Sequence, residues 1–276
     1  MRFVFLFFLM AHLLHARGIE DAQNYHKNSA LQERIARETI ELVPWTGVER
    51  VLDIGCGDGR ITYMLAGRVA NGSVLGIDVS SAMIDFASSR YTCSNLAFHL
   101  GSAEEIGAEN EFDRVVSFST FHFVQDVEKT VKAIYRALVP GGMACLHIYG
   151  KGIMNVTSIA DSLVHTDQWI SYFPTYQQER FYYSEEEHRT FLERAGFEKI
   201  EIKGSWYETP FSNRDALIEF ARPILTFIRH LPEPLQQEFI EDVVDQIISI
   251  AGQSEDGVIR YKLFNFQIVA IKGPFK

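Results

Sequence analysis

The segment Val51–Arg60, with the sequence VLDIGCGDGR, constrains the fold of this chain more than any other. Its first four residues are mainly apolar and predict a strand, and a helix pattern follows the segment up to about Val69. Between them stand Gly55, Gly57 and Gly59, and glycine lets a backbone turn sharply and approach a ligand closely. The helix after the turn also offers unpaired N–H groups. Strand, glycine turn and helix together predict an α/β fold with a ligand at the turn.

Two ligand classes that often bind such turns are excluded by the residues around the glycines. A dinucleotide fingerprint needs a small residue where Arg60 stands, because the helix packs closely on the strand there. A phosphate-binding loop needs a lysine followed by serine or threonine, which this segment lacks. The pattern therefore argues against nicotinamide and flavin enzymes and against a nucleoside-triphosphate loop.

Asp78 is the second candidate binding residue. It ends the predicted strand Ser73–Ile77, roughly 20 residues beyond the glycines, where an acidic side chain accepts hydrogen bonds from ribose hydroxyls. A helix cap is the alternative role, but Ser80 is better placed to cap the predicted helix Ser80–Arg90. The glycine turn and Asp78 together indicate a ribose-containing ligand.

Strand and helix patterns alternate through the middle of the chain. Strands are predicted over 51–54, 73–77, 96–100, 112–118 and 143–149, with helices over 60–69, 80–90 and 127–138. Such alternation predicts a parallel sheet with helices on both faces. An amphipathic helix is also predicted over Ser29–Leu42, before the first strand.

The remainder of the chain departs from this alternation. Residues 151–185 are aromatic-rich and predict irregular structure, followed by a helix over 186–195 and a strand over 197–202. Two helices, over 215–230 and 235–250, stand before a last strand over 263–271. We expect a single domain over 19–276. Its core covers about 45–150, 186–204 and 260–272, and insertions over 151–185 and 205–258 supply core packing, a lid, or both.

Composition excludes several partner classes. The net charge of −10 provides no positive field for a phosphate backbone, so no nucleic-acid partner is expected. The 47% hydrophobic content is ordinary for a folded protein. The nine histidines and three cysteines show no metal-ligand spacing, so no metal site is predicted.

At this point the chain resembles the class I S-adenosylmethionine-dependent methyltransferases. The resemblance rests on VLDIGCGDG, GIDVSSAMIDFA, FDRVVS and LVPGG, and it implies a Rossmann-like, seven-stranded, mostly parallel sheet whose last strand is antiparallel, with helices on both faces and helical lid insertions. It also implies S-adenosyl-L-methionine as methyl donor. In that family, Asp53 and Gly55 would lie beside the methionine moiety and Asp78 would bind the ribose. The implied cofactor-binding set is Gln32, Asp53, Gly55, Gly57, Asp78, Val79, Met83, Ser102, Ala103 and Ser117.

Two further segments sharpen the resemblance. YHKNSALQ (Tyr25–Gln32) and SFSTFHFVQD (Ser117–Asp126) are similar to the trans-aconitate, malonyl-carrier-protein and juvenile-hormone-acid methyltransferases. That group implies O-methylation of a carboxylate on a small-molecule acceptor. It also implies that Gln32 reaches the cofactor from the N-terminal helix, that Val79 and Met83 pack on the adenine, and that Ser102 and Ala103 flank it.

His122 is the candidate catalytic residue, because it would lie at the methyl end of the cofactor. A carboxylate with a pKa of about 4 is already ionised at neutral pH and needs no general base. His122 would then only orient the acceptor, and a structural histidine bonded to a loop carbonyl is the alternative. Two other functions stay open: methylation of nitrogen, carbon or a hydroxyl with a base such as His122, and cofactor binding without turnover.

The N-terminus carries a conflicting signal. Residues 1–18 place the apolar run Phe3–Leu14 behind Arg2 and end at Ala16-Arg17-Gly18, which has the form of an export signal. The run is too short for a stable membrane span. Because the implied cofactor is made and kept in the cytosol, we expect a cytoplasmic protein. Export through a signal peptide ending near Gly18 is the alternative.

Overall fold

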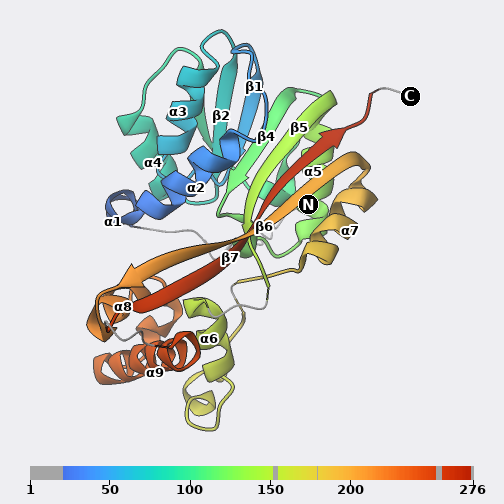
Figure 1. The fold of residues 1–276 in the computed structure, drawn as a ribbon. Helices are drawn as coiled ribbons and strands as arrows, with labels where there is room; N and C mark the ends of the chain where they lie inside the picture. The colour runs from blue at the N-terminus through green and yellow to red at the C-terminus, as the bar shows by residue number, and fades with distance from the viewer. Residues whose placement is uncertain (1–20, 152–154, 179, 253–256, 275–276) are drawn as a thin grey trace, which may run out of the picture.

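The computed structural model describes residues 21–151, 155–178, 180–252 and 257–274 (Figure 1). At its centre lies a sheet in the order β3-β2-β1-β4-β5-β7-β6. Its strands are β1 (Arg50–Ile54), β2 (Ser73–Asp78), β3 (Leu96–Leu100), β4 (Phe112–Phe118), β5 (Leu138–Tyr149), β6 (Phe197–Phe211) and β7 (Ile259–Lys272). The α-helices are α1 (Ala22–Asn28), α2 (Ala30–Ile40), α3 (Arg60–Arg68), α4 (Ser81–Arg90), α5 (Val127–Ala137), α6 (Val156–Leu163), α7 (Glu185–Ala195), α8 (Arg214–Ala221) and α9 (Glu233–Ala251). The predicted signal-like segment, residues 1–18, lies outside the described residues.

The direction of the strands confirms the predicted fold class. Strands β1 to β5 pair in parallel, whereas β7 runs antiparallel to both β5 and β6. The carboxyl ends of β1, β2 and β4 therefore meet at one edge of the sheet. At that edge the N–H groups of Gly55 and Cys56 both donate to the carbonyl of Ile77 (2.8 and 3.0 Å). These bonds hold the glycine turn beside the end of β2.

Helices cover both faces of the sheet, because successive strand residues point to opposite sides. Leu52 and Val115 face a cluster that includes α5 and α7. Their neighbours Val51 and Val116 face a second cluster, which includes α2 and α3. Each central strand is thus buried on both sides, as expected of parallel strands.

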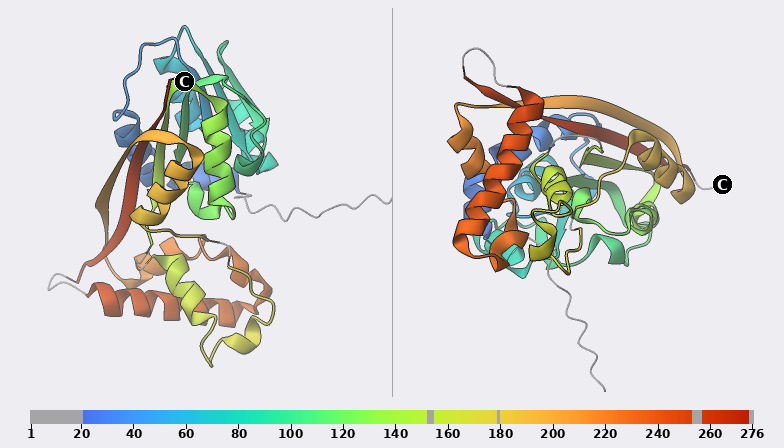
Figure 2. Two further views of the ribbon diagram at one scale, coloured as in Figure 1. Left: turned by 90° about the vertical axis from the view of Figure 1, so that its right-hand side faces the viewer. Right: turned by 90° about the horizontal axis from the view of Figure 1, so that it is seen from below.

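Strands β6 and β7 continue beyond the sheet as a two-stranded arm. The pairing of β5 with β7 ends at Tyr149 and Asn265, but β6 and β7 stay paired up to Phe211 and Ile259. We call residues 206–211 and 259–264 the arm. It carries the helices α6, α8 and α9, which with the short 3-10 helices η3 (Ile170–Tyr172) and η4 (Thr226–His230) we call the cap (Figures 1 and 2).

The cap has a core of its own. The side chains of Ile259, Tyr261 and Leu263 on the arm are buried together with apolar residues of α6, α8 and α9. The rings of Trp169 and Phe239 meet edge to face at 4.9 Å in the same cluster. The predicted helical insertions are therefore folded around a second hydrophobic centre, separate from the clusters on the sheet.

Several element boundaries differ from the sequence prediction. Strands β5 and β7 begin earlier than expected, at Leu138 and Ile259, and α1 precedes the predicted N-terminal helix. Residues 151–185 were expected to be irregular, yet they contain α6, whose β-branched and serine-rich sequence has low helix propensity but buries one side in the cap. The helix predicted over 215–230 breaks after Ala221, because Pro223 cannot continue it. The strand predicted over 197–202 runs on to Phe211, because β7 pairs with it throughout. No helix in the described parts of the chain has the length and apolar character needed to cross a membrane.

Candidate active site

The glycine turn after β1 forms one wall of a pocket at the carboxyl edge of the sheet. Gly55, Gly57 and Gly59 all have positive φ angles, of 71°, 52° and 78°. A Cβ atom on Gly55 would lie 2.2 Å from Oγ1 of Thr120, so only glycine fits there. The positive φ angles thus favour glycine at all three positions, and close contacts also exclude a side chain at Gly55 and Gly59.

The pocket is lined from both sides of this turn. Its walls come from α1, α2, the end of β1, the turn, the start of α3 and the end of β4. The lining residues are Tyr25, Ser29, Gln32, Glu33, Asp53, Gly55, Cys56, Gly57, Asp58, Arg60, Ile61 and Phe118. The structure thus brings together four residues of the predicted set: Gln32, Asp53, Gly55 and Gly57. Oε1 of Gln32 is buried and has no hydrogen-bond partner among the described residues, so the pocket wall carries an unsatisfied acceptor.

Two carboxyl groups stand at the base of this edge, the buried Asp53 and the half-buried Asp78. Asp53 is almost completely buried on β1 and accepts a hydrogen bond from Oγ1 of Thr62 at 2.8 Å. Burial raises the pKa of Asp53 to about 7. Asp78 accepts from the backbone N–H of Gly57 at 3.0 Å and of Ser80 at 2.9 Å, and burial raises its pKa as well. Glu33 and Asp58 add two further acidic side chains to the pocket lining, and Arg60, which also lines the pocket, pairs with both of them.

The other predicted binding residues lie along the same edge but do not line the pocket. Met83 is buried on α4, whereas Val79 is 47% exposed. Ser102 follows β3 and accepts a hydrogen bond from the N–H of Glu104 at 3.2 Å, which caps a short 3-10 helix that begins at Ala103. Ser117 is buried, and its hydroxyl donates to the carbonyl of Ile54 at 2.9 Å, which ties β4 to the end of β1. Ser117 therefore already has a structural partner.

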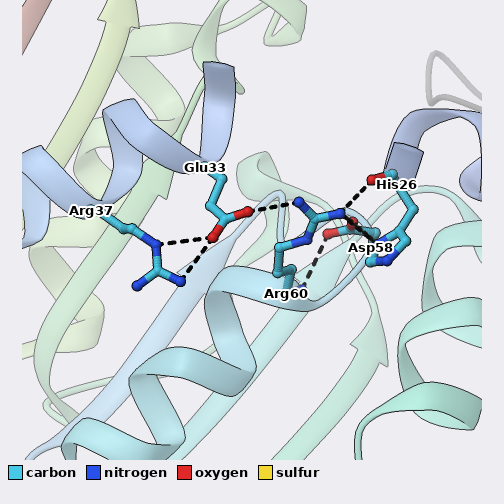
Figure 3. Close-up of polar contacts among 5 residues, drawn as sticks. All are labelled: His26, Glu33, Arg37, Asp58 and Arg60. Carbon is cyan, nitrogen blue, oxygen red and sulfur yellow. Dashed lines mark hydrogen bonds and ion pairs between the residues drawn. The ribbon is translucent and has the colours of Figure 1, made fainter. Parts of the chain in front are cut away.

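A charged network fastens the N-terminal helices to the glycine turn (Figure 3). Arg60 donates to Glu33 of α2 at 2.7 Å and contacts Nδ1 of His26 on α1 at 2.9 Å. His26 in turn lies 2.6 Å from Asp58 in the turn, and Arg37 forms an ion pair with Glu33 at 2.8 Å. Sequence reasoning used Arg60 only to exclude dinucleotide binding. Nothing in the sequence around Arg60 indicated that its side chain contacts both α1 and α2 at the pocket.

His122 lies beyond the end of β4 in a short 3-10 helix and is buried among aromatic rings. Ring centroids of Phe123, Tyr149 and Tyr182 stand at 4.3, 4.9 and 6.2 Å from it, the last nearly parallel. We call His122, Phe123, Tyr149 and Tyr182 the aromatic wall. Burial lowers the pKa of His122 well below its ordinary value, and Arg180 lowers it further. Nδ1 of His122 is buried without a hydrogen-bond partner among the described residues.

The aromatic wall adjoins the pocket through a polar network that sequence reasoning missed. Ser119 has a positive φ of 54°, and its Oγ lies 3.4 Å from the Tyr149 hydroxyl and 3.2 Å from Nδ1 of His147. His147 also contacts Asn265 of β7 at 3.1 Å, and burial lowers its pKa to about 4. Burial raises the pKa of Tyr25, which lines the pocket, and the nearby Asp58 and Tyr149 raise it further, so Tyr149 lies close to a residue of the pocket. These residues carry no spacing signal, because four separate elements bring them together.

Fold, pocket and sequence similarity agree on one class of protein. Residues 51–142 match the family model described as a methyltransferase domain, and this range contains the glycine turn, Asp78 and His122. The chain is an S-adenosylmethionine-dependent methyltransferase with a Rossmann-like fold.

Individual relatives are similar over most of the chain. One is the juvenile hormone acid O-methyltransferase of Bombyx mori, 27% identical over 246 residues that cover 83% of this chain and 86% of that protein. Another is the trans-aconitate 2-methyltransferase of Delftia acidovorans, 24% identical over 244 residues, or 81% and 87% of the two chains. A solved structure of phosphoethanolamine N-methyltransferase 2 from Haemonchus contortus, in complex with S-adenosyl-L-methionine, has a TM-score of 0.58 and 22% identity, and the match covers 87% of this chain and 52% of that one. The family resemblance predicted from the motifs is confirmed.

Proposed function

We propose that this enzyme methylates a carboxylate oxygen of a small-molecule acid. The observation that carries the proposal is the state of His122. A base whose pKa lies well below 6.5 is a poor proton acceptor for an amine or a hydroxyl. An acceptor that is already ionised fits this site better. The similarity to a relative named for O-methylation of an acid points the same way.

For this reaction the protein mainly has to align the methyl donor with the acceptor. S-adenosylmethionine supplies an electrophilic methyl group on a sulfonium centre. A lone pair of the carboxylate oxygen forms the new O–C bond as the C–S bond breaks, and no proton has to leave the acceptor. Holding the acceptor in line is the main task of the surrounding residues, and positioning can supply about 7–11 kcal/mol of barrier reduction. His122 then orients the acceptor and does not remove a proton from it.

The cofactor roles form part of the same proposal. Gln32, Asp53, Gly55 and Gly57 fit the methionine end, because they line one pocket at the end of β1, and the amide oxygen of Gln32 there has no hydrogen-bond partner among the described residues. Asp78 fits the ribose, because its carboxylate stands at the next strand end and is held by two backbone N–H groups. For the adenine end we propose Val79, Met83, Ser102 and Ala103, and we keep Ser117 as a support of the pocket floor.

The ribose role of Asp78 can be tested by calorimetry with S-adenosylhomocysteine. We expect Asp78→Ala to weaken binding by about 1.5–3 kcal/mol, the range for hydrogen bonds to a charged group. Asp85→Ala, on the following helix, is a control for the loss of a carboxylate near the site. Unchanged affinity in Asp78→Ala would contradict the assignment.

The acceptor class can be tested with matched compounds. Purified enzyme is incubated with methyl-deuterated S-adenosylmethionine and one candidate acceptor. The acceptors are decanoate, decanamide, decanol, juvenile hormone acid and trans-aconitate, and mass spectrometry identifies the labelled products. We expect labelled methyl on acids alone. Methylation of the amide or alcohol in place of the acids would overturn the proposal.

The cellular compartment of the enzyme is also part of the proposal. A methyltransferase needs its donor, and the donor is made in the cytosol, which favours a cytoplasmic enzyme over an exported one. Sequencing the N-terminus of protein from its natural source tests this. A mature chain that begins near Ile19 would favour export.

A further inference from the structure

The tyrosine at the end of β5 is held in place by the rings on either side of it. The ring of Tyr149 meets the ring of His122 edge to face at a centroid distance of 4.9 Å, and the ring of His147 in the same way at 5.3 Å. His147 is itself fixed, because it contacts Asn265 of β7 at 3.1 Å. The two histidines therefore determine the direction in which the phenol points.

The hydroxyl of Tyr149 keeps a proton that it can donate. Its oxygen accepts a hydrogen bond from Oγ of Ser119 at 3.4 Å, a long contact that uses a lone pair of the phenol and not its proton. No acceptor for that proton lies among the residues that the structure describes. Tyr182, the other tyrosine of the aromatic wall, differs, because its hydroxyl contacts the hydroxyl of Thr157 on α6. Burial raises the pKa of Tyr149, so its hydroxyl stays protonated at neutral pH.

His122 adds a second polar group without a partner. Nδ1 is buried, and neither ring nitrogen forms a hydrogen bond within the described part of the chain. Burial and, to a lesser degree, Arg180 lower the pKa of His122 well below 6.5, so the ring is neutral at pH 7 and carries one N–H. A buried polar group without a partner costs free energy. This arrangement favours a ligand that supplies the missing partner.

Tyr149 lies between the donor pocket and the core of the cap. Burial raises the pKa of Tyr25 in the pocket, and Asp58 and Tyr149 raise it further. Burial also raises the pKa of Tyr261 in the cap core, to which Tyr182 and Tyr149 add. The side chain of Tyr149 is only half-buried, so part of it remains accessible to a ligand. A methyl acceptor that enters between the cap and the donor would meet it there.

The charges near the aromatic wall have both signs. Burial raises the pKa of Tyr182 to about 12, while Arg180 lowers it and Asp161 raises it. Because these two charges oppose each other, recognition of an anion at the wall depends on hydrogen bonds. An ionised carboxylate has only acceptor atoms and therefore suits a pair of donors. Hydrogen bonds to such a charged group are roughly twice as strong as those between neutral groups.

We propose that the Tyr149 hydroxyl and the ring N–H of His122 bind the carboxylate of the methyl acceptor. Both donate to the oxygen that is not methylated. A lone pair of the other oxygen forms the new O–C bond as the C–S bond of the donor breaks, and no proton is transferred. Ser119 and His147 keep Tyr149 in position. This inference rests on the proposed function, because it names the groups that recognise the acid.

The test compares an acid with its uncharged amide. Protein saturated with S-adenosylhomocysteine is titrated with decanoate and with decanamide, for the wild type and for Tyr149→Phe, which removes only the hydroxyl. We expect decanoate binding to weaken about ten- to a hundred-fold, as for the loss of a hydrogen bond to a charged group, and decanamide binding to weaken less. The affinity for S-adenosylhomocysteine should stay unchanged. His122→Phe, which keeps a ring without an N–H, should weaken decanoate binding about ten-fold.

Tyr207→Phe is the matched control. The hydroxyl of Tyr207 on β6 donates to Glu38 at 2.6 Å, outside the pocket and the aromatic wall, so its loss should leave decanoate binding unaltered. Equal weakening of acid and amide by Tyr149→Phe would indicate a merely structural role and overturn the inference. A fall in S-adenosylhomocysteine affinity with unaltered decanoate binding would place the hydroxyl at the donor and overturn it too. So would wild-type protein that binds decanamide as tightly as decanoate.

Failure of this inference can be separated from failure of the proposed function. If acids are methylated and Tyr149→Phe leaves their KM unchanged, carboxylate methylation stands and the role of Tyr149 falls. If decanoate binding depends on Tyr149 but only nitrogen, carbon or hydroxyl acceptors are methylated, the carboxylate site stands and the proposed function falls.

Discussion

The donor pocket and the aromatic wall adjoin each other, yet they are built in different ways. The pocket consists of backbone turns and carboxylates fixed at the ends of neighbouring strands. The wall consists of side chains that come from the 3-10 helix after β4, from β5 and from the segment after the cap helix α6. The geometry of the turn is determined by residues adjacent in the sequence, whereas the aromatic wall depends on how distant segments pack together. Donor binding and acceptor selection should therefore respond separately to mutation.

The largest expected effect is at Gly55 in the pocket. Gly55→Ala forces a side chain into a positive-φ position, at about 1–2 kcal/mol, and into contact with Thr120, at about 1–3 kcal/mol more. We expect the free energy of unfolding, measured in urea, to fall by about 2–5 kcal/mol, and S-adenosylhomocysteine affinity to fall with it.

Gly67→Ala is the matched control for that change. Gly67 lies in α3, and a Cβ atom there meets no other atom within 4 Å. The change should stabilise the protein by about 0.5–1 kcal/mol, as alanine does in place of glycine within helices. Equal stability of the two variants would contradict the tight fit of the turn.

The next effect concerns pH and a buried histidine that lies outside these two regions. His188 on α7 is buried between the rings of Tyr183 and Phe266, and burial lowers its pKa to about 4. A lowered histidine pKa contributes stability above about pH 6.5 that is lost as the pH falls toward 4. His188 alone should account for a loss of about 3 kcal/mol over this interval.

His188→Phe removes this acid sensitivity while it keeps an aromatic ring in place. We expect its free energy of unfolding to fall less than that of the wild type between pH 6.5 and 4, in urea titrations at several pH values. His99→Gln, at an exposed site on β3, controls for the loss of a histidine. Parallel curves for wild type and His188→Phe would contradict the neutral buried state of His188.

The same contrast explains which parts of the fold and of the site could be predicted from the sequence alone. Glycine spacing and strand alternation predicted the order of elements, the antiparallel last strand followed from the family resemblance, and the Ser80 cap was confirmed by its bond from the N–H of Met83. Helix α6 was missed, because its stability comes from burial in the cap and not from propensity. The contact of Phe181 with His122 was missed, because it forms only when the segment after α6 folds back onto the 3-10 helix that follows β4.

The smallest expected effect concerns His122. His122→Gln keeps a hydrogen-bonding side chain but cannot act as a base. If the acceptor is a carboxylate, turnover should fall by about 1–2 kcal/mol, or roughly ten-fold, the value of one positioning bond. The wild-type pH–rate profile should lack a rising limb near pH 6.5, because the pKa of His122 lies well below that value. A loss on the order of a hundred-fold or more, with such a limb that vanishes in the mutant, would favour general-base methylation.

The chemical stability of the product tests carboxylate methylation most directly. Enzyme, methyl-labelled S-adenosylmethionine and an acid acceptor are incubated, and the isolated product is treated with mild alkali. A methyl ester hydrolyses under these conditions, so the account predicts that the label is released as volatile methanol. Label that stays on the acceptor after alkali would show methylation at nitrogen, carbon or an ether oxygen, and would contradict the account.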